Sequence, residues 1–294
     1  MTAPPPSTLR RADLVLVLAA LIWGLSFIVV KDALASTTPL AFTSVRFALA
    51  ALVLAPFTNL RPPYPRAELR AGALLGALLA VGFAAQTVGL VYTTPARSAF
   101  IVASSSVLAP VVAFIVVRER PHLWVVAALG LAGAGMYLLT APDAGGLNRG
   151  DVWTLVTALT FGGQIVAVAH LSRRHDPLRL VWMETMVTAV GAAIAAVLVE
   201  DVRVRWSLAL VGGLGYTAVL ATAVALLWQM RAQRFMSSAR AALIFCAEPV
   251  FAAIASWVWF GERLSALQWG GGGLILVGMV LAELPRARTD SDPV

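Results

Sequence analysis

The sequence predicts an all-α polytopic membrane protein with ten transmembrane helices, arranged as two inverted five-helix repeats. Three observations support this fold class. The 294 residues are 60% hydrophobic and only 13% charged, whereas soluble domains average about 45–50% apolar and about 25% charged residues. The chain contains ten apolar runs, each near the ~20 residues that a helix needs to cross a bilayer. It also matches itself when it is shifted along its own length.

The composition excludes several classes of protein. A water-soluble enzyme of this size cannot hide so much apolar surface, because more than half of any folded surface is already apolar. A disordered chain is excluded on the same composition, and a disulfide scaffold is excluded because Cys246 is the only cysteine. The net charge of +7 would suggest a nucleic-acid partner in a soluble protein. In a membrane protein it reflects basic loops, so we expect a lipid bilayer and no nucleic acid.

Charged residues, prolines and glycines separate the ten spans. Pro39 opens the second span and Pro121 opens the fifth, where the missing N–H of proline costs nothing. The stretch Pro142–Gly146 divides the two halves. The spans cover roughly residues 12–31, 39–57, 68–91, 96–117, 121–140, 150–171, 178–199, 206–231, 239–260 and 265–284. Short loops join them, so consecutive spans must pack antiparallel.

The first span is expected to be a retained helix and not a cleaved signal peptide. Arg10 and Arg11 resemble the basic start of a signal peptide, but the apolar run extends to Lys31 without a small-residue cleavage site.

Basic residues predict the orientation. Fifteen of them fall on the side of the membrane that holds the N-terminus and six on the other. This bias places both termini in the cytoplasm and the chain in the cytoplasmic membrane.

The chain contains an internal repeat, which divides it into residues 1–142 and 143–294. The polar, glycine and proline matches carry the most information. A shift of 143 pairs Arg97 with Arg240, Gln86 with Gln229, and Glu119-Arg120 with Glu262-Arg263, and a shift of 138 pairs Asp13 with Asp151, Gly24 with Gly162 and Pro39 with Pro177. Each copy has five spans, an odd number, so the second copy must enter the membrane from the opposite face. Inverted repeats of this kind are typical of secondary transporters.

The motifs of both repeats resemble one family. Residues 20–24 (Ala-Leu-Ile-Trp-Gly), 248–253 (Glu-Pro-Val-Phe-Ala-Ala) and 261–264 (Gly-Glu-Arg-Leu) are similar to motifs of the drug/metabolite transporter superfamily, and within it to the EamA-type family. Residues 109–112 and 118–120 form the first copy of the later motifs. The resemblance implies ten helices with both termini cytoplasmic. It also implies a central cavity lined by spans 1–4 and 6–9, with spans 5 and 10 at the periphery.

The two copies differ in the position of one proline. Pro110 lies nine residues before Glu119, whereas Pro249 lies thirteen before Glu262. Helices 4 and 9 are therefore expected to kink about one turn apart.

Three charged residues lie within spans, where a charge costs ~2.5–3.5 kcal/mol on insertion scales and usually faces a cavity or a partner. Arg46 and Glu184 are equivalent under the 138 shift. They are predicted to form a substrate clamp, with Arg46 for a carboxylate and Glu184 for an ammonium group, or a structural ion pair between helices 2 and 7; the third alternative is no contact.

The third charged residue, Glu248, directly precedes Pro249, which leaves a carbonyl one turn earlier without its donor. Glu248 is a candidate proton or cation site; alternatively it only hydrates a wet cavity.

Uncharged polar and aromatic residues complete the candidate site. Gln86, Gln164 and Gln229 suit polar groups of a substrate, but amides also bridge helices. Trp23 lies deep in the first span, so we expect it to line the cavity and not to anchor the helix at the interface.

Further candidates have gating or structural roles. Pro110 and Pro249 are expected to kink their helices. The pairs Glu119-Arg120 and Glu262-Arg263 end spans 4 and 9 on opposite faces. We interpret these pairs as caps or gate-rim ion pairs and not as substrate ligands.

Signatures of catalysis are missing from the sequence. A Walker A loop needs Gly-Lys-Ser/Thr, and the only lysine, Lys31, follows Val30. No HExxH or GxSxG motif occurs. We therefore expect no catalytic residues, no metal site, no cofactor and no enzymatic activity.

The expected function is secondary active transport of small metabolites by alternating access, and the resemblance suggests export of amino acids or related compounds. The alternatives are export of drugs, nucleosides or sugars, a non-transporting receptor or assembly protein, and an intramembrane lipid enzyme, which would need a nucleophile or metal cluster. The expected partners are a small-molecule substrate and the bilayer, with proton or cation coupling. A monomer or a homodimer fits these expectations equally.

Overall fold

The structure is a bundle of α-helices. The computed structural model describes residues 6–59, 64–117, 127, 130–131, 133–135, 137–138, 146–235, 241, 244–245 and 247–283. Its helices are α1 (Pro6–Ala33), α2 (Pro39–Leu54), η1 (Ala55–Phe57), α3 (Arg66–Tyr92), α4 (Pro95–Ala103), α5 (Ser105–Val117), α7 (Arg149–Leu171), α8 (Pro177–Val199), α9 (Leu208–Ala218), η3 (Val219–Val224), α10 (Ala225–Gln233), α12 (Glu248–Phe260) and α13 (Ala266–Glu283). An isolated bridge between Thr37 and Val204 is the only β-pairing among the described residues.

Seven helical segments of the described chain are long and apolar enough to cross a membrane. They are α1, α2 with η1, α3, α4 with α5, α7, α8, and α9 with η3 and α10. The ninth predicted span is represented by the shorter apolar helix α12 and the tenth by α13, while the fifth, 121–140, lies almost entirely outside the described residues. The prediction of an all-α polytopic membrane protein is thus confirmed, and the count of ten helices stays a prediction.

Polar and apolar side chains are distributed as lipid requires. Large apolar side chains are exposed on the outer faces of the helices, for example Leu52 on α2, Val197 on α8 and Val258 on α12. Many of the polar side chains are buried instead, among them a set of threonines. Several of these threonines donate to a carbonyl of their own helix four residues earlier, as Thr87 does to Phe83 (2.7 Å). A hydrocarbon surrounding offers no hydrogen bonds, so polar groups must be satisfied inside the bundle.

Helices of the two halves pack in matching pairs. The 138 and 143 shifts make α1 equivalent to α7, α2 to α8, and α3 to the continuous run of α9, η3 and α10. The packing of α3 on α7 has its counterpart in the packing of that run on α1, and the packing of α4 and α5 on α7 has its counterpart in α12 on α1. The equivalent helices α2 and α8 pack directly on each other.

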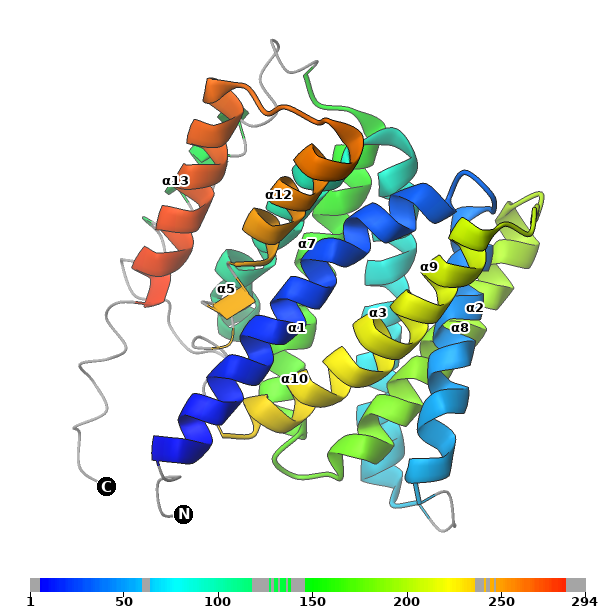
Figure 1. Ribbon diagram of the computed structural model, residues 1–294. Helices are drawn as coiled ribbons and strands as arrows, with labels where there is room; N and C mark the ends of the chain where they lie inside the picture. The colour runs from blue at the N-terminus through cyan, green and yellow to red at the C-terminus, as the bar shows by residue number, and fades with distance from the viewer. Residues whose placement is uncertain are drawn as a thin grey trace, which may run out of the picture.

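The equivalent helices α1 and α7 run in opposite directions. Near the end of α1, Lys31 Nζ donates to Leu90 O (2.5 Å) and Thr93 O (3.0 Å) at the end of α3. The hydroxyl of Thr93 donates to Asp151 Oδ1 (3.1 Å) in the first turn of α7. The end of α1 therefore meets the start of α7. In Figure 1, α1 begins and α13 ends at the lower side of the bundle.

The break in the fourth span corrects the expected offset between the kinks. The helix is interrupted at Ser104, and the equivalent region of the ninth span is interrupted at Ala247. These positions are exactly 143 residues apart, so the prediction of kinks one turn apart is wrong. New helices begin at Ser105 and Glu248. Pro249 lies in the first turn of α12, whereas Pro110 lies inside α5, five residues after its start.

Two glycines bring the backbones of these restart points close to the first helix of each repeat. A Cβ on Gly24 of α1 would lie 2.8 Å from Glu248 O, and a Cβ on Gly162 of α7 would lie 3.0 Å from Ser105 O. Both distances are shorter than ordinary van der Waals contact. Only glycine permits the approach without a backbone shift, so the residues that follow Ser104 and Ala247 are held against α7 and α1.

The π-helical segment η3 interrupts the eighth span and is fastened by two side chains from the first repeat. Trp23 Nε1 donates to Ala221 O (2.8 Å). Arg46 is 2% exposed, and its Nε donates to Thr222 Oγ1 (2.8 Å) while one Nη lies 3.5 Å from Ala221 O. Its guanidinium also lies 4.7 Å from the centre of the Phe83 ring, a cation–π distance. Arg46 thus ties α2 to η3 and α3.

Substitution of Gly24 by alanine should destabilise the fold. The new Cβ would collide with Glu248 O and with Phe251 Cβ, each at 2.8 Å, and overpacking of this kind costs about 1–3 kcal/mol. Gly212→Ala is the control, because nothing lies within 4 Å of its Cβ position and alanine favours helix formation. Thermal unfolding of the purified protein in detergent should show a lower Tm for Gly24→Ala only. An unchanged Tm for Gly24→Ala would contradict the close approach of α1 and α12.

Substitution of Thr222 by valine should also destabilise the fold. It removes the acceptor of a buried guanidinium hydrogen bond, and bonds to charged groups contribute about 1.5–3 kcal/mol. Thr217→Val is the matched control, because Thr217 is equally buried and its hydroxyl bonds only within its own helix, to Gly213 O (2.7 Å) and more weakly to Leu214 O. In denaturant unfolding, the free energy of unfolding of Thr222→Val should be clearly lower than that of Thr217→Val. Equal losses of stability in the two variants would refute the role of Arg46 in tying α2 to η3.

Candidate functional site

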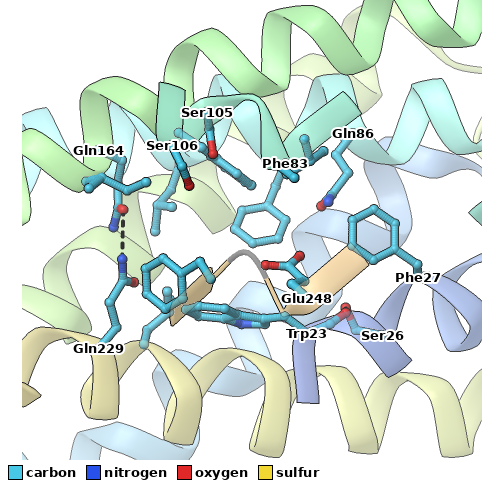
Figure 2. A pocket seen from close by; sticks show the side chains of 17 residues that line it. Trp23, Ser26, Phe27, Phe83, Gln86, Ser105, Ser106, Gln164, Gln229 and Glu248 are labelled. Carbon is cyan, nitrogen blue, oxygen red and sulfur yellow. Dashed lines mark hydrogen bonds between the residues drawn. The ribbon is translucent and has the colours of Figure 1, made fainter. Parts of the chain in front are cut away.

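A pocket lies between the helices of the two halves, and 17 side chains line it (Figure 2). They come from α1, α3, α4, α5, α7, α10, α12 and the residues just before α12. The lining residues are Trp23, Ser26, Phe27, Leu79, Phe83, Gln86, Val102, Ala103, Ser105, Ser106, Phe161, Gln164, Ile165, Leu226, Gln229, Phe245 and Glu248. Spans 2 and 7 contribute none of them, although the family resemblance implied that they line the cavity.

Most of the lining residues are equivalent in pairs. Fourteen of the 17 form seven pairs under the two shifts: Trp23 with Phe161, Ser26 with Gln164, Phe27 with Ile165, Phe83 with Leu226, Gln86 with Gln229, Val102 with Phe245, and Ser105 with Glu248. The pocket is thus built from the same positions of both repeats. Its walls differ in chemistry, because a carboxylate stands on one side where a serine stands on the other.

Glu248 is the only charged residue among those that line the pocket. It occupies the first turn of α12, held close to α1 by Gly24. Figure 2 shows its carboxylate pointing into the pocket between Phe83 and Trp23. The carboxylate makes no hydrogen bond or ion pair with any residue that the structure describes.

The three candidate amides, Gln86, Gln164 and Gln229, line the pocket. Gln229 Nε2 donates to Gln164 Oε1 (3.2 Å), so this pair bridges α10 and α7 while both residues face the pocket. The Nε2 of Gln164 is buried and has no partner among the described residues. Gln86, equivalent to Gln229, lies near Phe27 and Phe83 in Figure 2. The Gln164 amide therefore has one buried nitrogen whose hydrogen-bonding capacity is unsatisfied.

Two aromatic pairs form much of the remaining wall. Trp23 and Phe245 meet edge to face with ring centres 5.4 Å apart, and Phe83 and Phe161 lie 5.0 Å apart. The expectation for Trp23 is met in that it lines the pocket. The four phenylalanines of the lining were not predicted, because an apolar span gives no sign of which aromatic residue faces inward. The repeat could have found Phe161, since it is the equivalent of Trp23.

Arg46 and Glu184 do not line the pocket. Arg46 points to η3, as described above, and lies behind the ring of Phe83. Glu184 is fully buried in α8, and neither of its carboxylate oxygens has a partner among the described residues. The ion pairs of the described chain join other residues, so neither the clamp nor the structural ion pair is formed.

The described residues that we expected to gate or kink the helices lie in or directly after α5 and α12. Pro249 is buried in the first turn of α12, and Pro110 falls within α5. Glu262 follows Gly261, which ends α12 in a left-handed conformation (φ 64°), and accepts a hydrogen bond from Ser256 Oγ. Arg263 is exposed and forms no ion pair with Glu262. Glu119 and Arg120 lie outside the described residues.

No three His, Cys, Asp or Glu side chains of the described ranges gather where they could hold a metal ion. The described lining of the pocket offers one carboxylate, amide and hydroxyl groups, and aromatic rings.

Comparison with known proteins places these features in a family. The model of the EamA-like transporter family matches residues 10–141 and again residues 148–284. An uncharacterized transporter of Archaeoglobus fulgidus is 35% identical over 93% of this chain and 86% of its own length. The uncharacterized inner membrane transporter YedA of Escherichia coli is 28% identical over 93% and 91%, respectively.

A solved crystal structure has the same fold, with a TM-score of 0.69 over 96% of this chain and 99% of that chain at 20% sequence identity. The family model covers nearly the whole sequence, and its expected helical membrane architecture agrees with the structure described above. This chain belongs to the EamA-like transporter family.

Proposed function

We propose that this protein is a secondary transporter that moves small metabolites across the cytoplasmic membrane by alternating access. The observation that carries the proposal is the pocket, whose walls are contributed by equivalent positions of both repeats. Sites of this kind, at the interface of inverted repeats, are where secondary transporters bind their cargo. The opposite directions of α1 and α7 support an inverted arrangement of residues 1–142 and 143–294.

The proposed cargo class is amino acids or related compounds, moved in the direction of export. One relative carries the name of an inner membrane transporter, which supports the same location for this chain. The distribution of basic residues supports a cytoplasmic position for both termini. Transport needs no covalent step, so the polar groups of the pocket act by binding alone.

A cluster of charges closes the bundle at the end where α7 begins. Asp151 is fully buried and accepts hydrogen bonds from Arg97 Nη2 (2.5 Å), the backbone N of Asn148 (2.8 Å) and the hydroxyl of Thr93. The last two groups belong to the start of α7 and the end of α3. One buried carboxylate therefore holds α3, α4 and α7 together.

A second set of contacts lies about one helical turn further from this end of the bundle. The hydroxyls of Ser98 and Thr154 are 3.3 Å apart. Beside them, Gly89 and Gly150 let α3 and α7 approach so closely that a Cβ on Gly150 would lie 2.6 Å from Gly89 O. We propose that these contacts separate the pocket from this end of the bundle, and that the Arg97–Asp151 pair is part of a closed gate there.

The repeat supplies the same charges at the opposite end. Asp13 is equivalent to Asp151, and Arg240 is equivalent to Arg97. In an alternating-access cycle the two halves exchange conformations, and the second pair then takes the place of the first. Arg240 lies outside the described residues, so this part of the proposal rests on the sequence correspondence.

Transport itself is tested with protein reconstituted into liposomes. Vesicles loaded with unlabelled amino acids, amines, nucleosides or sugars should accumulate the same labelled compound by exchange for at least one member of the panel. The exchange should saturate and should be absent from protein-free vesicles. A complete lack of exchange across the panel would refute the proposed function.

The gate is tested by access of a reagent to the pocket. A thiol is introduced by Ser105→Cys in a Cys246→Ala background, and a membrane-impermeant maleimide is added from the side where α7 begins. Arg97→Gln should raise the labelling rate about tenfold, because loss of a charge-assisted hydrogen bond shifts a two-state equilibrium by roughly that factor. The double charge exchange Arg97→Asp with Asp151→Arg should restore slow labelling.

Arg203→Gln is the control for the gate. Arg203 pairs with Asp201 at 2.7 Å, but both side chains are exposed, and the backbone O of Arg203 bonds Thr38 at the start of α2 on the same end of the bundle. Its loss should leave labelling unchanged. Equal labelling of Arg97→Gln and the parent protein would show that the pair does not close the pocket.

A further inference from the structure

We infer that the pocket takes organic cations: compounds with a protonated amine joined to an apolar body, and with no carboxylate of their own. This inference rests on the proposed function and changes its cargo: of the compounds related to amino acids it selects amines, and it sets aside amino acids themselves because they carry a carboxylate. Three features of the described pocket support it: its single charge, the orientation of the buried Arg46, and its aromatic walls.

The only charge in the described lining of the pocket is negative. Glu248 supplies a carboxylate, while Lys, Arg and His are absent from the described lining. The carboxylate has no hydrogen-bond or ionic partner within the described chain, and it is directed into the empty space (Figure 2). An ionised group inside a membrane protein is costly unless it is paired. The group that would pair with the Glu248 carboxylate is a cation, and a ligand bound in the pocket can provide that cation.

The buried arginine cannot offer a compensating charge to a ligand. Arg46 is turned toward Thr222 and Ala221, and the ring of Phe83 lies against its guanidinium. Phe83 is itself part of the pocket wall. A ligand carboxylate would therefore face Glu248 with an aromatic ring between it and Arg46. Two like charges in a site of low polarity repel each other strongly, so the pocket disfavours zwitterionic and anionic ligands.

The walls beside Glu248 are aromatic. Figure 2 shows the carboxylate between Phe83 and Trp23, with Phe27 on a third side. Aromatic faces attract ammonium groups through the ring quadrupole, and tryptophan does so most strongly. Phe161 and Phe245 extend the aromatic surface around the pocket. A cation seated near Glu248 is thus surrounded by rings, and the apolar body of the ligand has a matching surface.

The far side of the pocket carries amides and no charge. There Gln229 donates to Gln164, and the Nε2 of Gln164 is buried without a partner in the described chain, so a ligand oxygen can accept from it only if the amide turns toward the pocket. The asymmetry between the two walls fixes the orientation of the ligand. Its ammonium group lies toward the second repeat, where Glu248 stands, and not toward Ser105, the equivalent residue of the first repeat.

Binding is tested on the purified full-length protein with four compounds that share a phenyl ring. They are phenethylamine (cation), phenylalanine (zwitterion), 2-phenylethanol (neutral) and 3-phenylpropionate (anion), and calorimetry measures the Kd of each. Phenethylamine should bind at least about tenfold more tightly than the other three, the factor that corresponds to one lost ionic contact. Phenylalanine binding as tightly as phenethylamine, or no detectable binding of phenethylamine, would overturn the inference.

Variants locate the charge that is responsible. Glu248→Gln keeps the size of the side chain and should weaken phenethylamine binding about tenfold or more while 2-phenylethanol is unaffected. Asp201→Asn, which removes an exposed carboxylate far from the lining, should change nothing. The double variant Glu248→Ser with Ser105→Glu moves the carboxylate to the equivalent wall, and it should recover part of the affinity. Unchanged affinity in Glu248→Gln, with unchanged thermal unfolding, would contradict the assignment.

The same compounds separate this inference from the proposed function. If the liposomes exchange phenethylamine and the Glu248→Gln variant does not, both the cation inference and the proposed function are supported. Exchange of phenylalanine, nucleosides or sugars without exchange of phenethylamine overturns the cation inference and leaves the transporter proposal standing. A third outcome is that exchange of another compound requires Glu248 and responds to protons or sodium ions while the protein binds no amine. This result likewise overturns the inference, because Glu248 then binds the coupling ion and not the cargo.

Discussion

The structure depends on one constraint: lipid cannot hydrogen-bond, so the bundle must satisfy its own polar groups. Apolar side chains therefore cover the outer faces, and threonines, amides and charges are turned inward. Most of these groups find partners, as Arg46 does on η3 and Asp151 does on Arg97. Partners are incomplete at Glu248 and the Gln164 amide, which line the pocket, and also at Glu184, which is buried away from it. The pocket is thus one place where polar groups of the bundle remain unsatisfied.

Duplication determines where that place lies. Helices at equivalent positions meet across the interface of the two halves, so the pocket is lined twice by the same set of positions. Gly24 and Gly162 make equivalent close contacts, and the helices that restart at Glu248 and Ser105 begin at equivalent points. The backbone thus preserves the repeat, while the side chains have diverged. A charge on one wall alone is compatible with this symmetry because it changes the chemistry of the pocket without changing its shape.

Much of this arrangement could be predicted from the sequence. Apolar runs and the matched Gln, Gly and Glu-Arg positions indicated the helical class and the repeat, and Trp23 and Glu248, which we expected near a cavity, line the pocket. For Arg46 and Glu184 the sequence left three alternatives open, and the described structure has the one without contact between them. The sequence does not reveal that Arg46 lies behind an aromatic ring. The π-helical turn at η3 has no recognisable signal in residues 219–224. The restart at Ser105 was missed because proline was given more weight than the backbone contacts across the interface.

Lys31 gives this fold an unusual chemical property. It is the only lysine among 22 basic side chains, and its ammonium group caps the carbonyls at the end of α3, next to the cluster around Asp151. Apart from the N-terminal amine, reagents that acylate primary amines therefore have a single target in the whole polypeptide. Any covalent modification or spectroscopic label introduced in this way reports on one corner of the molecule, the corner where the ends of α1 and α3 meet the start of α7.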